Sequence, residues 1–202
     1  MIAVVDYDAG NLHSAAKGLA AAGGEPVLTS DPRVIAEAAG VVLPGVGAFC
    51  DCVGKIRERG LQEPIRQYIA SGRPFLGICI GLQVLFERGA EGAGAPGLGV
   101  FPGEVARICA PGLKIPHMGW NSLRFAQPSA LFEGIPEGAY VYFVHSYHAV
   151  ADPGDLVATC DYGAPVTAAV QRGNCFGVQF HPEKSSTVGL RLLRNFVEMA
   201  AA

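Results

Sequence analysis

The first half of the chain alternates short apolar runs with segments whose apolar side chains recur at helical spacing. A short apolar run bounded by turn residues is typical of a buried strand, and apolar residues three or four apart are typical of an amphipathic helix. Strands are predicted over residues 2–5, 26–29, 41–43 and 74–78, and helices from Asn11 to Gly23, from Asp31 to Gly40, and over about 48–58 and 61–71. This alternation predicts a parallel sheet with helices on both faces.

The pattern changes after the glycine-rich segment 89–99. Strands with short connections are predicted over residues 100–108, 118–125, 140–150, 156–160 and 166–180, with a hairpin turn at 172–174. A final helix is predicted with Leu190, Leu193, Phe196 and Val197 facing the core. The predicted fold class is α/β with three layers: a mostly parallel open sheet, helices on both faces, and an antiparallel, β-rich C-terminal half. No repeat or long linker divides the chain, so one domain over residues 1–202 is expected.

Composition restricts the classes of partner. Half of the 202 residues are hydrophobic, 16% are charged, and the formal net charge is −3. These values are typical of a compact globular protein and argue against nucleic acid as a partner. The apolar runs are too short to span a membrane, and the first residues predict a strand rather than a leader peptide. The six cysteines include no C-x-x-C pair, so reduced thiols and a cytoplasmic location are expected.

One cysteine stands in a motif with chemical meaning. The stretch 77–81 reads Gly-Ile-Cys-Ile-Gly and leads into a segment with helical spacing that ends at Gly89. A strand that turns at once into a helix exposes the turning side chain at the helix N-terminus, and flanking glycines permit the crowded backbone. A helix N-terminus favours the thiolate form of cysteine, so Cys79 is a candidate nucleophile. Taken alone, the motif fits a structural thiol in a glycine-rich turn equally well.

A histidine and a glutamate follow another strand-like run. Residues 177–180 lead into His181-Pro182-Glu183, which puts His181 at the carboxyl end of a strand, where Cys79 also lies if both strands share one sheet. Residues i and i+2 of an extended segment point the same way, so Glu183 can hold one imidazole nitrogen while the other faces a thiol. Each residue alone could be a loop histidine or a solvated carboxylate. Together with Cys79 they predict a Cys-His-Glu triad.

A turn near the predicted nucleophile supplies candidate oxyanion donors. Attack of a thiolate on an amide develops negative charge on oxygen, which needs convergent N–H groups. Ile80 follows the nucleophile at a helix start, and Val46 or Gly47 in the Pro-Gly-Val-Gly stretch 44–47 could provide the second donor.

The remaining histidines do not predict a metal site. His145 and His148 have H-x-x-H spacing, but they lie in the apolar β run 140–150. On a strand that spacing points the two rings to opposite faces. His117 and Trp120 fit either a core or a contact surface.

Three stretches together resemble the class-I glutamine amidotransferases, the glutaminases that use a triad. They are residues 77–83 (Gly-Ile-Cys-Ile-Gly-Leu-Gln), 44–49 (Pro-Gly-Val-Gly-Ala-Phe) and 181–185 (His-Pro-Glu-Lys-Ser). Three further stretches, 6–14, 116–121 and 142–148, are similar to the family of glutaminase subunits of imidazole glycerol phosphate synthases, which serve histidine biosynthesis. The resemblance covers essentially the whole chain. It departs at Asp8, where glycine is expected in the opening motif, and at Ile80 and Leu82, which replace the more usual Leu and Met.

The resemblance implies a mechanism and a set of site residues. Cys79 would attack the carboxamide of L-glutamine, His181 would relay protons, and Glu183 would orient His181. Ile80, Val46 and Gly47 would stabilise the oxyanion, and ammonia would leave a glutamyl thioester that water hydrolyses. The residues implied to hold glutamine are Gly47, Gln83, Ser146 and Tyr147. No cofactor and no metal are implied.

The resemblance also implies a partner. The chain has the length of one glutaminase domain, so the site that accepts ammonia is expected on another chain. In the resembling family that chain is a (β/α)₈-barrel cyclase subunit, which forms a heterodimer and makes imidazole glycerol phosphate. The residues expected at the docking face are Asn11, Met118, Trp120, Asn121 and Lys184.

Other functions are compatible with parts of this pattern. One is a non-catalytic binding subunit that kept the fold, against which the presence of Cys79, His181 and Glu183 together argues. A glutaminase subunit of another ammonia-using synthase, such as that of vitamin B6 synthesis, would share the triad but is not expected to carry the tryptophan-containing stretch 116–121. A cysteine hydrolase or a thiol sensor of the same sheet class would share only the turn at Cys79.

Overall fold

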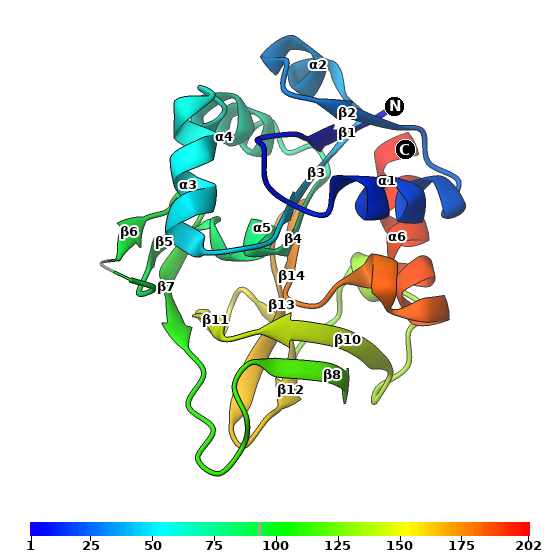
Figure 1. Ribbon diagram of the computed structural model, residues 1–202. Helices are drawn as coiled ribbons and strands as arrows, with labels where there is room; N and C mark the ends of the chain where they lie inside the picture. The colour runs from blue at the N-terminus through cyan, green and yellow to red at the C-terminus, as the bar shows by residue number, and fades with distance from the viewer. Residues whose placement is uncertain (93) are drawn as a thin grey trace.

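A mixed sheet runs through the middle of the molecule. The computed structural model describes residues 1–92 and 94–202, and these residues form an eight-stranded sheet (Figure 1). Its order is β2 (Pro26–Thr29), β1 (Ile2–Val5), β3 (Gly40–Gly45), β4 (Phe75–Cys79), β14 (Cys175–Val178), β13 (Pro165–Arg172), β12 (Leu156–Asp161) and β9 (Arg124–Phe125). The strands from β2 to β14 are parallel, and β13, β12 and β9 continue the sheet antiparallel. The predicted fold class is confirmed.

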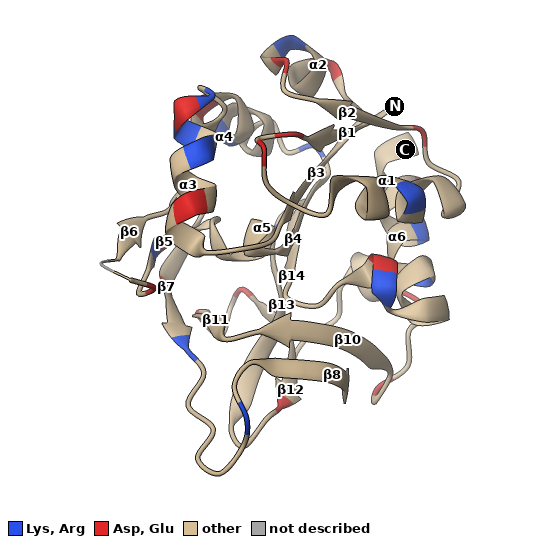
Figure 2. Ribbon diagram, viewed as in Figure 1, with Lys and Arg blue, Asp and Glu red and all other residues tan. Residues whose placement is uncertain are grey.

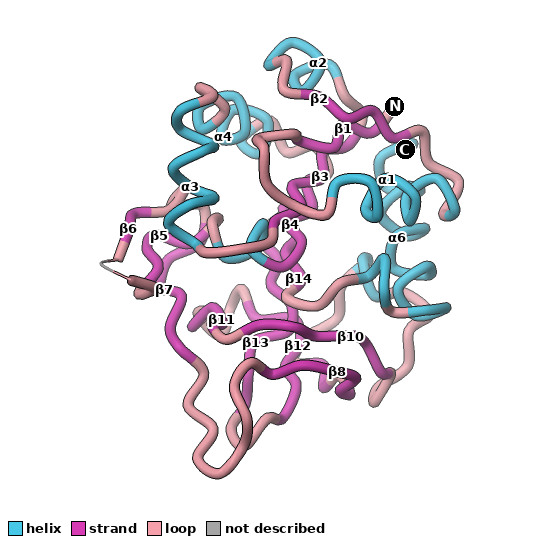
Figure 3. The backbone as a smooth tube through the Cα atoms, in the orientation of Figure 1, coloured by secondary structure: helices cyan, strands magenta, loops and turns pink. Residues whose placement is uncertain are grey.

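Helices cover both faces of this sheet, as the sequence predicts. Helices α1 (Leu12–Ala21) and α6 (Ser186–Ala201) lie on one side, and α3 (Phe49–Glu58) and α4 (Gln62–Ala70) on the other (Figures 1 and 3). The short α2 (Pro32–Glu37) packs against α4. Asp31 caps it by accepting a hydrogen bond from the Arg33 N–H at 2.8 Å, as its position before Pro32 predicts. Asn11 precedes α1, but its side chain makes no capping hydrogen bond to the described residues.

Two smaller sheets extend from the carboxyl edge of the large one. One pairs β8 (His117–Ser122) with β10 (Tyr140–His145), and the other has the order β11 (Tyr147–Val150), β7 (Phe101–Arg107), β5 (Phe86–Gly89) and β6 (Ala95–Pro96). The predicted strand 140–150 is therefore two strands, divided at Ser146, because its halves pair with different neighbours, β8 and β7. The predicted strand 118–125 is likewise divided into β8 and β9.

The helix predicted from Cys79 to Gly89 is wrong. Helix α5 covers Ile80–Gln83 only, and the chain then turns into β5. The carbonyl groups of Val84 and Leu85 accept hydrogen bonds from the N–H groups of Leu98 and Val100, each at 2.7 Å, so tertiary pairing replaces the helical bonds. Phe86 stacks on Phe101 instead of completing a helical face.

The end of β3 also differs from the prediction. Pro44 and Gly45, predicted to begin a loop, are the last two residues of the strand, and Gly45 pairs with Cys79. The predicted final helix is α6, in which Leu193 and Phe196 are buried. Leu192 is buried as well, whereas Leu190 and Val197 are only half-buried.

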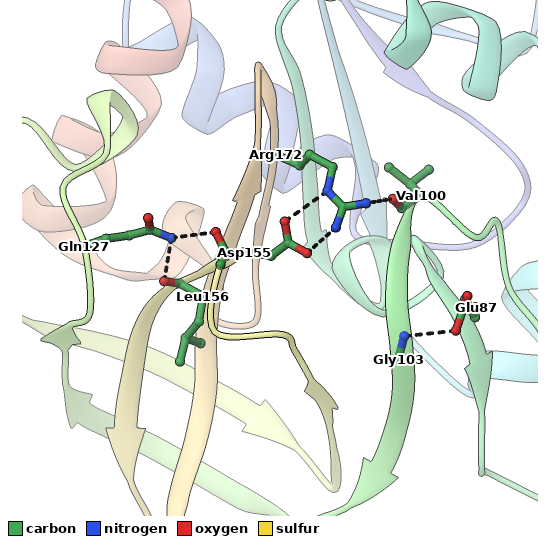
Figure 4. Close-up of polar contacts among 8 residues, drawn as sticks. Glu87, Val100, Gly103, Gln127, Asp155, Leu156 and Arg172 are labelled. Atoms are coloured by element: carbon green, nitrogen blue, oxygen red, sulfur yellow. Dashed lines mark hydrogen bonds and ion pairs between the residues drawn. The ribbon is translucent and has the colours of Figure 1, made fainter.

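A partly buried ion pair ties the β12–β13 hairpin to the smaller sheets. Arg172 contacts both carboxylate oxygens of Asp155, at 3.0 and 2.5 Å, and donates a further hydrogen bond to the Val100 carbonyl at 3.0 Å (Figure 4). The bidentate geometry and the 9% exposure of the Asp155 side chain make this pair a stronger constraint than an ordinary surface contact.

Charge is distributed unevenly over the elements. Lysine, arginine, aspartate and glutamate lie mainly on the helices and loops, while β8 and β10 carry none (Figure 2). None of the helices in the described part of the chain has both the length and the apolar character needed to cross a membrane.

Candidate active site

The strand-to-helix turn predicted at Cys79 is present. Cys79 ends β4 with φ 56° and ψ −111°, an unfavourable conformation for a residue with a Cβ, and α5 begins at the next residue. A Cβ on Gly81 would lie 1.8 Å from the Leu43 carbonyl oxygen, and one on Gly77 would lie 2.5 Å from the Gly81 oxygen. Both flanking glycines are therefore required for the chain to turn here, and the turn fixes the thiol by backbone packing.

His181 and Glu183 reach the same edge of the sheet from the other end of the chain. Strand β14 runs parallel to β4, with Val178 opposite Ile78, so His181 lies just beyond the carboxyl end of β14. Its Nδ1 is 2.8 Å from Oε1 of Glu183, and both side chains are 3% exposed. Glu183 lies in the 3₁₀ turn η2 (Pro182–Lys184). It is covered by α1, where a Cβ on Gly18 would come within 3.2 Å of the Glu183 Cβ.

The charge state of His181 follows from these neighbours. Burial lowers the pKa of His181, but the adjacent Cys79 and Glu183 side chains raise it more strongly, to about 9. The imidazole is therefore protonated at neutral pH, which suits pairing with a thiolate on one side and a carboxylate on the other. Its Nε2 and Oε2 of Glu183 are buried without a hydrogen-bond partner within residues 1–92 and 94–202.

A cavity of about 310 Å³ joins the predicted residues. This volume is at the lower end of the range for small-molecule sites, about 300–1,000 Å³. The predicted residues that line it are Val46, Gly47, Cys79, Ile80, Gln83, Ser146, Tyr147 and His181. Glu183 lies behind His181 and does not line the cavity. The arrangement places a thiol and an imidazole in one small cavity next to candidate N–H donors.

The strand that carries the candidate oxyanion residues is held by the opening motif. The Tyr7 hydroxyl donates a hydrogen bond to the Pro44 carbonyl at 2.8 Å, and burial raises the pKa of Tyr7 well above its usual value, so it remains a donor. Asp8, which departs from the resembling family's motif, adopts φ 62°. Aspartate tolerates this left-handed conformation better than most residues, so the turn forms without the expected glycine.

Three polar groups near the cavity are not predicted by the sequence. Glu91 lines the cavity and accepts a hydrogen bond from the Phe49 N–H at 2.7 Å. It lies in the glycine-rich segment 89–99, where nothing in the sequence distinguishes it. Gln179 is fully buried, and its Nε2 is 3.8 Å from the Cys79 sulfur. A polar residue inside the apolar run 177–180 was the available signal, because a buried amide needs partners.

The third group is a pair of buried histidines. His145 donates from Nδ1 to the Tyr147 carbonyl at 2.8 Å, and its Nε2 is 2.9 Å from Nδ1 of His117. Burial lowers the pKa of His145 to about 3 and that of His117 to about 4, so both rings are neutral. His148 lies against the Thr167 N–H instead, and the H-x-x-H spacing does not bring its two rings together. No group of three metal-binding side chains occurs in the part of the chain that the structure describes.

The residues predicted at a docking face differ in exposure and in the side of β8 on which they lie. Met118 and Trp120 are 61% and 52% exposed on the outer face of β8. Trp120 meets the Tyr142 ring edge-on at 6.1 Å, and Lys184 Nζ lies 5.9 Å from the centre of that ring. Asn121 faces the other side of β8, where its amide contacts His117 and the Asp161 carbonyl. Asn11 is half-buried in front of α1.

The protonation of His181 predicts how stability depends on pH. Its pKa rises from the ordinary 6.5 to about 9, so the folded state binds a proton that the unfolded state has lost between these values. The stabilisation is fully present below pH 6.5 and is lost as the pH rises through 9. At about 1.4 kcal/mol per pH unit it amounts to up to about 3 kcal/mol.

Two measurements check this prediction. In NMR titrations, one of the five histidines should titrate near pH 9, and Glu183→Gln should lower that midpoint. Urea unfolding between pH 6.5 and 9.5 should show a loss of stability in the wild type that His181→Gln lacks. A His181 ring that titrates near 6.5 in the folded protein would contradict the ion pair.

Comparison with known proteins identifies the family of this chain. Residues 3–200 match the family model described as glutamine amidotransferase class-I. The chain is 57% identical to the imidazole glycerol phosphate synthase subunit HisH of Synechococcus sp. (strain JA-3-3Ab), over 99% of this chain and 94% of the relative. It is 51% identical to the subunit of the same name from Moorella thermoacetica, over 98% of this chain and 94% of the relative.

Solved structures agree on the fold. A crystal structure described as glutamine amidotransferase covers all of this chain and all of its own, with a TM-score of 0.78 and 20% identity. The structure of PurLQS from Thermotoga maritima covers 98% of this chain and 97% of its own, with a TM-score of 0.76 and 21% identity. The resemblance found in the sequence is thus confirmed by full-length relatives, and the chain belongs to the class-I glutamine amidotransferase family.

Proposed function

We propose that this chain is a single glutaminase domain that hydrolyses L-glutamine through a thioester on Cys79 and delivers the ammonia to a synthase partner in histidine biosynthesis. The observation that supports it most directly is the convergence of Cys79, His181 and Glu183 at one edge of the sheet. These residues come from strand ends about a hundred positions apart, and His181 contacts Glu183 while sharing a cavity with Cys79.

The first half of the proposed reaction forms the thioester. The Cys79 thiolate attacks the carboxamide carbon of glutamine, and the developing oxyanion accepts hydrogen bonds from backbone N–H groups. Ile80 at the start of α5 and the Val46–Gly47 turn line the cavity and are the candidate donors. The His181 imidazolium gives its proton to the leaving nitrogen, so ammonia departs and the imidazole is left neutral.

The second half releases glutamate. The neutral imidazole takes a proton from water, the resulting hydroxide attacks the thioester carbon, and the C–S bond breaks to return the thiolate. Glu183 keeps the ring in place through its 2.8 Å contact with Nδ1 and stabilises the imidazolium that forms again.

The cavity offers groups for both ends of glutamine. Gly47, Gln83, Ser146 and Tyr147 line it and are the proposed contacts. Oε1 of Gln83 is buried and has no partner among the described residues, which leaves an acceptor for a ligand N–H group. The Glu91 carboxylate, which also lines the cavity, has the charge to pair with the α-ammonium group of an amino acid.

The outer face of β8 and β10 is the proposed docking surface for a (β/α)₈-barrel cyclase partner. The relatives are named as subunits of imidazole glycerol phosphate synthase. This face lacks charged residues within the strands and exposes Met118, Trp120 and Tyr140, as interface cores do. Val144 of β10 lines the glutamine cavity, so the face is continuous with the site where ammonia forms.

A coupled assay tests this function. The chain mixed with a cyclase subunit of a barrel type should release glutamate and support glutamine-dependent formation of imidazole glycerol phosphate, faster than the chain alone releases glutamate. Co-purification of the two chains should accompany the activity. Equal glutamate release with and without the cyclase would contradict the coupling.

The docking surface has its own test within that assay. Trp120→Ala should weaken binding by about thirtyfold, since a central aromatic anchor is worth about 2 kcal/mol or more, and should lower the coupled rate accordingly. Val27→Ala is the matched control, because Val27 is 40% exposed on β2, outside the proposed surface, and should change neither. An unchanged dissociation constant for Trp120→Ala would place the partner elsewhere.

A further inference from the structure

Gln179 is a buried amide to which the proposed mechanism gives no task. It follows the last residue of β14 and is 0% exposed. Its backbone N–H is engaged with the Ala168 carbonyl at 2.8 Å, so the backbone is held by β13. Its side-chain Nε2 lies 3.8 Å from the sulfur of Cys79, within the range of a hydrogen bond to sulfur.

The orientation of this amide is determined by its neighbours. Gln83 donates from Nε2 to the Tyr147 carbonyl and to Oε1 of Gln179, both at 2.9 Å. A backbone carbonyl can only accept, so the nitrogen of Gln83 must face it. The second hydrogen of that nitrogen then requires the oxygen of Gln179, which leaves the Gln179 NH₂ group directed at Cys79.

Because the Gln179 NH₂ group is buried, leaving it without a hydrogen-bond partner costs free energy. An amide N–H that is excluded from water and points at a sulfur atom gains little from a neutral thiol and much more from a thiolate. The thiolate has two stabilising neighbours in this arrangement: the His181 imidazolium and the Gln179 amide, which approach from consecutive parts of the segment that follows β14.

We propose that Gln179 is a positioning residue that donates a hydrogen bond to the Cys79 thiolate and holds it in its ionised form. This role rests on the proposed function only for its catalytic consequence, since the stabilisation of the thiolate needs no substrate. In glutamine hydrolysis it raises the fraction of enzyme ready to attack. It also stabilises the sulfur as leaving group when water cleaves the thioester, because the C–S bond electrons then return to sulfur.

The hydrogen bonds form a chain that runs from the Tyr147 carbonyl through Gln83 and Gln179 to the sulfur of Cys79. Both hydrogens of the Gln83 amide are used in this chain. Gln83 therefore sets the direction of the Gln179 donor while it lines the substrate cavity.

The test follows the alkylation of Cys79 by iodoacetamide from pH 5 to 10 in the full chain, with each modified peptide quantified by mass spectrometry. Gln179→Glu keeps the acceptor for Gln83 and replaces the donor to sulfur with a carboxylate, and Gln179→Met loses both groups without adding charge. Gln171→Glu is the matched control, because the Gln171 amide contacts the Gly173 carbonyl and lies away from Cys79. The exposed Cys109 serves as an internal reference in every sample.

Loss of the donor should reduce the Cys79 alkylation rate at pH 7 by about tenfold or more, since hydrogen bonds to charged groups are worth about 1.5–3 kcal/mol. The pH midpoint of alkylation should rise by about one unit or more, while the plateau at high pH stays that of the wild type. A purely structural role would lower the plateau and leave the midpoint in place.

The outcomes separate this inference from the proposed function. Midpoints for both Gln179 variants equal to those of the wild type and Gln171→Glu would overturn the inference. A shifted midpoint in a protein that does not hydrolyse glutamine would uphold the role of Gln179 and overturn the function. Melting curves show whether each variant is folded. The carboxylate of Gln179→Glu also repels a thiolate, so the midpoint of the uncharged Gln179→Met decides the test, and Gln179→Leu takes its place if Gln179→Met does not fold.

Discussion

Cys79→Ala should lower glutamine hydrolysis by at least about 10⁴-fold, because removal of a catalytic nucleophile leaves only binding and oxyanion stabilisation. Cys79 lines the cavity, and the hydrogen bond to its sulfur is the 3.8 Å contact with the Gln179 amide, so the fold and partner binding should persist. Glutamate release and melting temperature are the two measurements.

Cys109→Ala is the control for this prediction, because Cys109 is exposed and lies outside the cavity. It should retain wild-type hydrolysis. A glutamine-analogue electrophile should label Cys79, and glutamine should protect it, whereas a thiol sensor or a protease would lack that protection. Substantial hydrolysis by Cys79→Ala would remove this residue from the nucleophile role.

Among substitutions of the glycines that flank Cys79, Gly81→Ala should destabilise the fold most. Its Cβ would lie 1.8 Å from the Leu43 carbonyl oxygen, a backbone atom that cannot move without separating β3 from β4. The expected loss of stability is about 3 kcal/mol or more, which lowers the melting temperature by about 6–12 °C. Hydrolysis should fall as well, because β3 carries the candidate oxyanion turn.

Gly54→Ala provides the comparison. Gly54 lies inside α3, and a Cβ at this position would meet no atom within 4 Å beyond its own stretch of helix. Alanine should therefore change stability by no more than about 1 kcal/mol, in the stabilising direction. Urea unfolding of both variants measures the difference. Similar stabilities for the two would show that the Leu43–Gly81 contact is not tight in solution.

Several elements of the fold could be predicted because their signals are local. Asp31 before Pro32 marks a helix start, and the two residues between Arg172 and Cys175 mark a hairpin; both features occur as predicted. The pairing of β14 with β4 could not be predicted. The sequence indicates only that His181 and Cys79 meet if their strands share one sheet, since nothing local in residues 175–178 selects a neighbouring strand.

The predictions failed where a distant segment competes with local periodicity. Leu82, Leu85 and Phe86 have helical spacing, yet the Leu98 and Val100 N–H groups take the carbonyls that a longer α5 would use. Tyr140–Val150 reads as one strand because its hydrophobicity is continuous. The division at Ser146 depends on partners elsewhere in the chain: β10 pairs with β8, from Tyr140–Ser122 to His145–His117, and β11 pairs with β7, from Tyr147–Arg107 to Val150–Glu104.

The candidate site shows the same limit. Cys79 could be assigned because its glycine spacing has direct geometric meaning. The predicted pairing of His181 with Glu183 assumes an extended segment; Glu183 lies in the 3₁₀ turn η2 instead, and the contact forms nevertheless. Period-two alternation in β8 could also have separated Asn121, which faces inward, from Met118 and Trp120, which face outward. The contact of Gln179 with Cys79 depends on two parallel strands lying side by side, which the sequence around residue 179 does not encode.

The position of β14 between β4 and β13 has a consequence for biosynthesis. While the ribosome is still producing the segment before residue 175, β4 has an unpaired edge and the nascent chain carries a thiol with no imidazole beside it. Only after the β13–β14 hairpin inserts into this gap do His181 and Glu183 arrive together. Ammonia release is thereby postponed until translation has passed the last strand. An unfinished polypeptide therefore does not hydrolyse the cell's glutamine.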